Sequence, residues 1–183
     1  MLLFISQNTF FKNQKMKQLT SQLAMTKAEY FKFLSKFRSL QLSTIGENGR
    51  PESSYAPFVV TQNNQFYIYV SALARHTNNL LNDGRAGIMI IEAEEEADNI
   101  FARKRASFDC DVEIVERETE DWRIIMLMFD GLAGELMETL RRLQDFQLLR
   151  LLPKSGLFVT GFGKAYRISG KRMDDLSHIN PQK

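Results

Sequence analysis

The sequence predicts a mainly β protein with six or seven antiparallel strands and inserted helices, as an α+β fold or a small closed barrel. Strand-like segments follow one another closely in the first half of the chain, joined by short polar turns at 46–50 and 61–65. Strands in meander order with such turns are typical of antiparallel structure. Helical periodicity is confined mainly to residues 26–38 and 119–142.

Length and composition indicate one soluble globular domain. The chain has 183 residues, of which 44% are hydrophobic and 25% charged, and its net charge is +2. This balance gives no indication of a nucleic-acid partner. No apolar run approaches the roughly 18 residues that a membrane span requires, so no membrane partner is expected. The single cysteine, Cys110, excludes an internal disulfide and fits a cytoplasmic location.

Three regions are expected along the chain. Residues 1–25, with their mostly polar stretch, are predicted to be a flexible N-terminal extension, and residues 26–170 the folded domain. Residues 171–183 are predicted to be a polar C-terminal tail. Thr26-Lys-Ala-Glu29 has the pattern of a capping box and predicts that the first helix begins there.

The strands are predicted from alternation and from the turns that bound them. The first hairpin has Asn48-Gly49 at its turn, and Pro57 in the returning strand indicates an edge or a bulge. Pro153-Lys-Ser-Gly156 predicts a further tight turn. The expected strands are 39–45, 53–60, 66–70, 87–91, 106–115, 145–152 and 157–168. Gly131 and Gly134 are expected to divide residues 119–142 into two short helices.

The stretch Ser71–Leu80 joins two of these strands and opens a short helical pattern. Arg75, His76 and Asn79 lie at its start. Basic side chains and free backbone N–H groups at a helix start suit a phosphate or a carboxylate. A solvated connection between strand and helix explains the same residues equally well.

The chain holds two histidines, His76 and His178, which excludes a His-only metal cluster within one chain. Acidic residues at 92–98 could bind a divalent cation, but such a run is more often a solvated face. The basic cluster Arg103-Lys-Arg105 follows it. On composition alone this cluster is a solvated basic face, and His178 is an exposed surface histidine.

Three segments in this order resemble the pyridoxamine 5′-phosphate oxidase-like, FMN-binding split-barrel superfamily. They are Leu40–Thr44, Gly49–Phe58 and Ala74–Leu80, and the resemblance covers roughly residues 30–170. It implies a split β-barrel in which Arg75 and His76, with Asn79 beside them, hold the phosphate of FMN. His76 stands where the superfamily usually has lysine.

A narrower resemblance is to the heme-utilisation branch of this superfamily, the HutZ/HugZ-type proteins. The segments that carry it are Phe101–Asp109, Leu143–Phe146, Gly156–Tyr166 and Asp174–His178. This resemblance implies a homodimer with heme at the subunit interface.

The same resemblance implies a role for each candidate residue. His178 is expected to ligate the heme iron. Asp145, from the other subunit, is expected to hydrogen-bond the ligating imidazole and raise its basicity. A distal arginine is expected within the Arg103–Arg105 cluster, at Arg105. On chemical grounds, Arg103, Lys104 and Arg105 could also pair with the heme propionates. As a strand-start residue, Asp145 equally well caps a turn.

The expected function is heme utilisation, with oxidative degradation of heme and release of iron. The alternatives are an FMN-dependent oxidoreductase using Arg75, His76 and Asn79, a non-catalytic heme carrier or storage protein, and an interaction module without a cofactor. The heme donor and the electron donor have no signature in the sequence.

Overall fold

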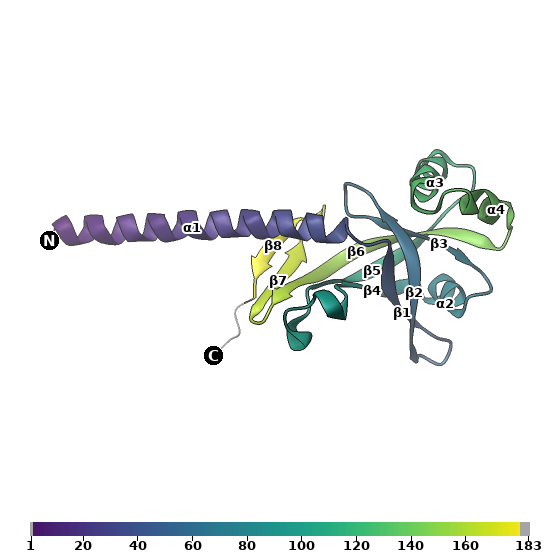
Figure 1. Cartoon of the computed structure of the whole chain (residues 1–183), viewed down its shortest axis with the longest axis horizontal. Coiled ribbons are helices and arrows are strands. Elements are labelled where there is room, and N and C mark those ends of the chain that lie inside the picture. Colours follow the sequence, from purple (N-terminus) through teal and green to yellow (C-terminus); the bar gives the residue numbers. More distant parts are fainter. Residues whose placement is uncertain (1, 180–183) are drawn as a thin grey trace.

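Eight antiparallel strands form one sheet, part of which closes into a barrel. The computed structural model describes residues 2–179. The strand order is β3-β2-β1-β4-β5-β6-β7-β8, and an additional pairing of β3 with β6 closes the first six into a barrel (Figure 1). The bounds are β1 Ser39–Ile45, β2 Pro51–Val60, β3 Phe66–Ser71, β4 Arg85–Ile91, β5 Arg105–Val115, β6 Phe146–Gly161, β7 Lys164–Ser169 and β8 Asp175–His178. The predicted antiparallel, mainly β fold is confirmed.

The barrel interior is filled by the inward side chains of alternating strand positions. Along β1, Leu40, Leu42 and Thr44 are buried while their neighbours are exposed or half-buried. Phe66 and Phe108 meet at the centre, with ring centroids 5.1 Å apart. This core fixes the register of every barrel strand, because a slip by one residue would turn the apolar set outward.

β6 is a single strand of 16 residues, where two strands and a turn at 153–156 were predicted. β5 pairs with both halves of β6, and the register shifts where Cys110 faces Pro153 and Asp109 faces Ser155. Proline donates no hydrogen bond, so the pairing accommodates it with a bulge at Lys154. The chain turns instead after Gly161, which separates β6 from β7.

Helix α1 runs from Leu2 to Leu34, and much of it projects beyond the barrel alongside β7 and β8 (Figure 1). The predicted start at residue 26 was wrong. The preceding segment contains no proline or glycine, and Thr26 lies inside the helix, donating its hydroxyl to the carbonyl of Gln22 at 3.0 Å. Tyr30 and Phe33 anchor the last turns in the core. The flexibility of residues 1–25 stays a prediction.

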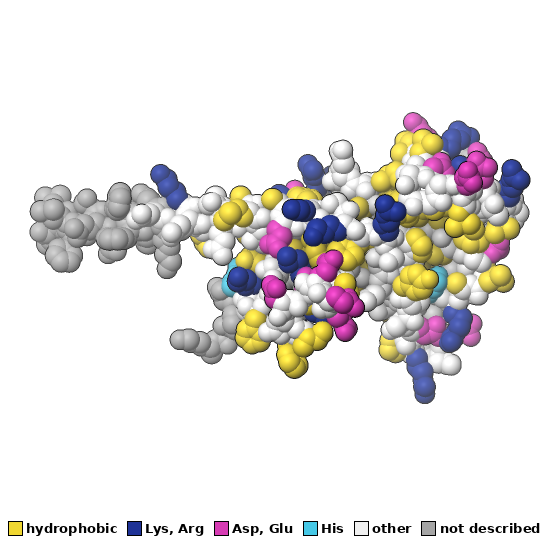
Figure 2. Space-filling model, in the orientation of Figure 1, with side chains coloured by type: hydrophobic (Ala, Val, Ile, Leu, Met, Phe, Trp, Pro, Cys, Tyr) yellow, Lys and Arg dark blue, Asp and Glu magenta, His cyan; other side chains and the backbone are white. Residues whose placement is uncertain are grey.

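Helices α3 (Glu120–Ala133) and α4 (Leu136–Arg142) cover the outside of the barrel at β2 and β3. Gly134 and Leu143 directly follow the two helices as C-caps, so the predicted division holds at Gly134, whereas Gly131 lies within α3. Their buried side chains form a second core with Tyr67 and Tyr69. Figure 2 shows apolar side chains gathered on the surface over this region. The exposed ones there include Ile124, Leu127 and Leu136.

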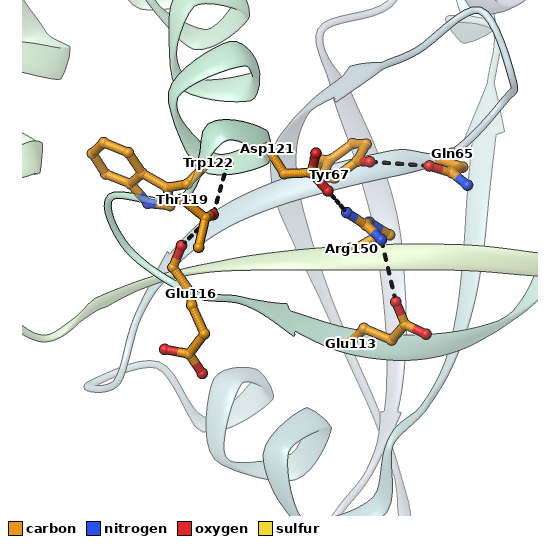
Figure 3. A network of polar contacts seen from close by, with 8 residues as sticks. All are labelled: Gln65, Tyr67, Glu113, Glu116, Thr119, Asp121, Trp122 and Arg150. Carbon is orange, nitrogen blue, oxygen red and sulfur yellow. Dashed lines mark hydrogen bonds and ion pairs between the residues drawn. The ribbon is translucent and has the colours of Figure 1, made fainter.

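A polar network joins α3 to the barrel strands (Figure 3). Arg150 of β6 donates to Asp121 at 2.6 Å and to Glu113 at 3.4 Å, and its guanidinium lies 5.5 Å from the ring centre of Tyr67. Thr119 caps α3 by accepting a hydrogen bond from the backbone N–H of Trp122. Among residues 2–179, no helix is both long and apolar enough to cross a membrane.

Candidate functional site

His178 lies at the end of the edge strand β8 rather than in a loose tail. β8 pairs with β7, so that His178 faces Tyr166, and the two rings meet edge to face with centroids 5.1 Å apart. Two contacts fix the preceding turn. The side-chain amide of Asn64 donates to the carbonyl of Arg172 at 2.9 Å, and Lys27 of α1 pairs with Asp174 at 3.0 Å.

A groove of about 550 Å³ lies between α1 and this end of the sheet. Its walls are mostly apolar, and they include the imidazole side chain of His178. They are formed by Leu19, Gln22 and Leu23 of α1 and by Tyr166, Leu176, Ser177 and His178. The volume falls in the range of about 300–1,000 Å³ typical of small-molecule and cofactor sites. An apolar slot with one nitrogen ligand fits a planar metalloporphyrin.

The basic cluster lies at the start of β5 and serves partly to hold the preceding loop. Arg103 donates to the backbone carbonyl of Glu92, with Nε at 3.1 Å, and pairs with Glu94 at 3.1 Å. Arg105 donates to the carbonyl of Arg103 at 3.0 Å. Both guanidiniums are half-buried and keep further N–H donors.

The strand register separates Arg105 from His178. Ala106, Phe158, Tyr166 and His178 form one row across the sheet, on the face towards α1. Arg105 occupies the next row, and neighbouring residues on a strand point to opposite faces. Three strand spacings, about 14 Å, also lie between β5 and β8. Within one chain, therefore, the Arg105 side chain does not point towards the His178 groove.

Asp145 lies at the opposite end of β6 from the groove. Its carboxylate accepts a hydrogen bond from the Ser71 hydroxyl at 2.5 Å, and its carbonyl accepts one from the N–H of Ala72 at 2.8 Å. Phe158 of β6 lies in the same row across the sheet as His178. The extended segment from Asp145 to Phe158 is on the order of 40 Å long. Within one chain Asp145 caps the end of β3, as the turn-capping interpretation expects, and does not reach His178.

The second candidate site lies at the start of α2 (Arg75–Asp83), in a pocket of about 320 Å³. Arg75 forms an ion pair with Glu52 of β2. The buried Asn79 amide donates to the Glu52 carboxylate at 3.0 Å and to the Thr44 hydroxyl at 2.9 Å. His76 is half-buried, and this burial lowers its pKa below the ordinary value of 6.5.

Sequence reasoning did not identify Glu52 or the groove walls Leu19, Leu23 and Tyr166. Glu52 faces Thr44 in the first hairpin, so the hairpin register could have indicated it. Leu19 and Leu23 continue the helical spacing of the buried Tyr30 towards the N-terminus. Within residues 2–179, no cluster of three or more His, Cys, Asp or Glu side chains could hold a metal ion, so the acidic run has no such arrangement.

Comparison with known proteins gives consistent matches over most of the chain. The family model for pyridoxamine 5′-phosphate oxidase matches residues 26–160. Heme oxygenase HutZ of Vibrio cholerae is 41% identical over 167 residues, which cover 91% of this chain and 94% of that protein.

Solved structures agree with the sequence matches. The crystal structure of HutZ, described as the heme storage protein from Vibrio cholerae, superposes with a TM-score of 0.69 at 38% identity, covering 73% of this chain and 94% of that one. Campylobacter jejuni ChuZ superposes with a TM-score of 0.76 at 34% identity, covering 87% of this chain and 66% of that one. An FMN-binding protein from Nostoc punctiforme, at 17% identity, shares the fold with a TM-score of 0.54, covering 79% of this chain and 87% of that one.

Proposed function

This chain belongs to the pyridoxamine 5′-phosphate oxidase family, in its HutZ-type heme-utilisation branch, and from this we propose that it binds heme and degrades it oxidatively to release iron. The observation that carries the proposal is the apolar groove beside α1 with His178 at its wall. The names of its relatives, heme oxygenase and heme storage protein, support heme as the ligand.

His178 supplies the iron ligand in this proposal. A neutral imidazole is a common axial ligand of heme iron. Leu19, Leu23 and Leu176 offer apolar contacts to the porphyrin faces. Because β7, α1 and the 170–174 turn hold the strand of His178, little ordering of the chain is needed before the ligand binds.

The remaining predicted residues fit the proposal if two chains assemble. Asp145 and Arg105 both lie away from the His178 groove within one chain. In this proposal a second subunit supplies the Asp145 carboxylate, which orients the imidazole, and the arginine on the open side of the ligand. Phe101 and Phe162, which are 88% and 82% exposed, support burial of this region by a partner.

The chemistry needs dioxygen and an external electron donor, and heme supplies the iron at which oxygen is activated. The task of the chain is to hold the ring and to direct hydrogen-bond donors at its open face. Arg105 is the residue proposed for that role, and Arg103 for pairing with a propionate. That the protein degrades heme, rather than storing it, is a separate step of the proposal and is tested separately.

The first test is a hemin titration of the apoprotein followed by absorbance. We expect a sharp Soret band that saturates at one heme per chain. His178→Ala should lose or shift this band. His76→Ala is the matched control, because it removes the other histidine of the chain and should leave the band unchanged. An unchanged spectrum in His178→Ala would remove that residue from the site.

Adding ascorbate under air then separates an enzyme from a carrier. We expect the Soret band of the wild-type complex to decay while iron becomes available to a ferrous chelator. Arg105→Ala should slow this decay while retaining the heme complex. A stable Soret band with ascorbate and with an enzymatic reductase would favour storage over degradation.

A further inference from the structure

We propose that Glu52 makes the α2 pocket reject phosphate-bearing cofactors such as FMN, because its carboxylate occupies the anion position between Arg75 and Asn79. Glu52 is thus a specificity-determining residue of the barrel. The inference goes beyond the heme proposal and does not depend on it, since it concerns a different pocket and a different class of ligand.

The geometry of the pocket supplies the first argument. Glu52 binds the Arg75 guanidinium through one carboxylate oxygen and the Asn79 amide through the other, at 3.0 Å. These two donors are the side chains that the split-barrel resemblance assigns to the cofactor phosphate, together with His76. Both side chains therefore already hold a carboxylate within the chain, and a phosphate in the same position would have to displace it.

Glu52 is held in this position by the strands around it. β2 places it directly opposite Thr44, whose hydroxyl accepts the other hydrogen bond of the Asn79 amide. The Gly46 backbone packs so closely that an added Cβ would lie 3.0 Å from the Glu52 carboxylate. The Glu52 side chain is only 25% exposed. Swinging it out of the pocket would break contacts on two sides.

Electrostatics adds to the steric argument. A phosphate monoester carries about −1.5 to −2 charge at neutral pH and would lie beside a carboxylate of the same sign. Arg50 is the second cation in the pocket wall, but it is exposed to solvent, which screens its charge. His76 does not line the pocket, and its lowered pKa favours the neutral ring at pH 7. We consider the phosphate and the Glu52 carboxylate about 4 Å apart, in a dielectric like that of water. Their repulsion would then lower the affinity for the phosphate by roughly ten- to thirtyfold.

The test compares binding of FMN and of inorganic phosphate to the wild type and to Glu52→Gln. Glutamine keeps the length of the side chain and an acceptor for Asn79 but removes the charge. Quenching of flavin fluorescence reports FMN binding, and calorimetry reports phosphate. We expect about tenfold or greater gain in FMN affinity for Glu52→Gln, with a matching trend for phosphate.

Two further variants make the result specific. Glu47→Gln removes a charge of the same sign from an exposed residue of the same pocket that holds neither Arg75 nor Asn79, and it should raise FMN affinity much less than Glu52→Gln does. Adding Arg75→Ala to Glu52→Gln should abolish the gain, because the freed cation is then absent. Glu52→Ala serves as a second release variant if the glutamine protein does not fold, with circular dichroism as the check.

Three outcomes would overturn the proposal. These are tight stoichiometric FMN binding by the wild type, equal affinity in the wild type and both release variants, and a gain that survives Arg75→Ala. None of them bears on the hemin titration. A failure of heme binding would likewise leave the role of Glu52 untouched.

Discussion

His76 is a titratable side chain whose environment, rather than its sequence position, decides its charge. Half-burial at the start of α2 lowers its pKa below 6.5, because the charged imidazolium loses hydration there. The unfolded chain keeps the ordinary value and so binds a proton more readily than the folded chain between the two pKa values. The folded state therefore loses stability as the pH falls through 6.5 and below.

The first prediction concerns this residue. The apoprotein should lose more free energy of unfolding between pH 7.5 and pH 5 than His76→Gln, which has no group to charge at this position. Above pH 7.5, where the histidine is neutral in both states, the two pH profiles should run parallel. Urea denaturation at several pH values measures both. Parallel profiles over the whole range would mean that His76 is not desolvated in solution.

At the scale of elements, most strands could be predicted from alternation, from short apolar runs and from the turns that bound them. The predicted strand 39–45 matches β1, and 66–70, 87–91 and 106–115 fall within β3, β4 and β5. β8 escaped prediction because it is short and polar, with Leu176 as its buried anchor. The continuity of β6 escaped it because local turn chemistry at Pro153 was outweighed by pairing with β5, a partner distant in sequence.

The candidate site, like the fold, could be predicted only in part from the sequence. The helix-start pattern indicated the α2 residues and the resemblance indicated His178, but no local pattern indicated that α1 would form a wall of the groove beside β8. That wall depends on Leu19 and Leu23, which lie in a segment that polarity alone marked as an extension. Contacts between the two ends of a chain are set by packing, so periodicity could not reveal them.

The second prediction belongs to helix α3. Its N-cap Thr119 accepts from the N–H of Trp122 at 3.2 Å. Thr119→Ala should lower the free energy of unfolding by about 1 kcal/mol, because that N–H loses its partner at the buried side of the helix start. Thr119→Ser should recover most of it. Urea denaturation followed by tryptophan fluorescence measures the change.

Thr20 provides the control for this substitution. It lies within α1 and is exposed, and its hydroxyl donates to the Met16 carbonyl. Alanine is the better helix former at such a position, so Thr20→Ala should leave stability unchanged or slightly raised. A loss as large as that of Thr119→Ala would mean that threonine removal itself, rather than loss of the cap, causes the effect.

At the scale of the whole molecule, the separation of His178 from Asp145 leads to a third prediction. If each site takes His178 from one subunit and Asp145 from the other, His178→Ala and Asp145→Ala homodimers should both be deficient in heme degradation. Unfolding and refolding the two variants together should restore about a quarter of the wild-type sites, because half of the dimers are mixed and each has one intact site. Initial rates with ascorbate measure the recovery.

Mixing the two variants also tests the geometry directly. Complementation is impossible when both residues of a site come from the same chain, so the mixture would then remain as inactive as its parts. The wild type mixed with the double variant His178→Ala/Asp145→Ala is the control. Its mixed dimers have no site with both residues if the sites are shared, so its activity should fall below the simple average of its parents.

The long strand β6 has a consequence for how the molecule opens. It belongs to the closed barrel over its first half and supports β7 and β8 over its second half. β8 can therefore detach from β7 while the barrel pairing stays intact, which makes the outer sheet a separate unit of local unfolding. The proposed ligand site lies on that unit. A bound ligand would thus slow amide exchange in β7 and β8 first, while exchange in the barrel would still report global unfolding.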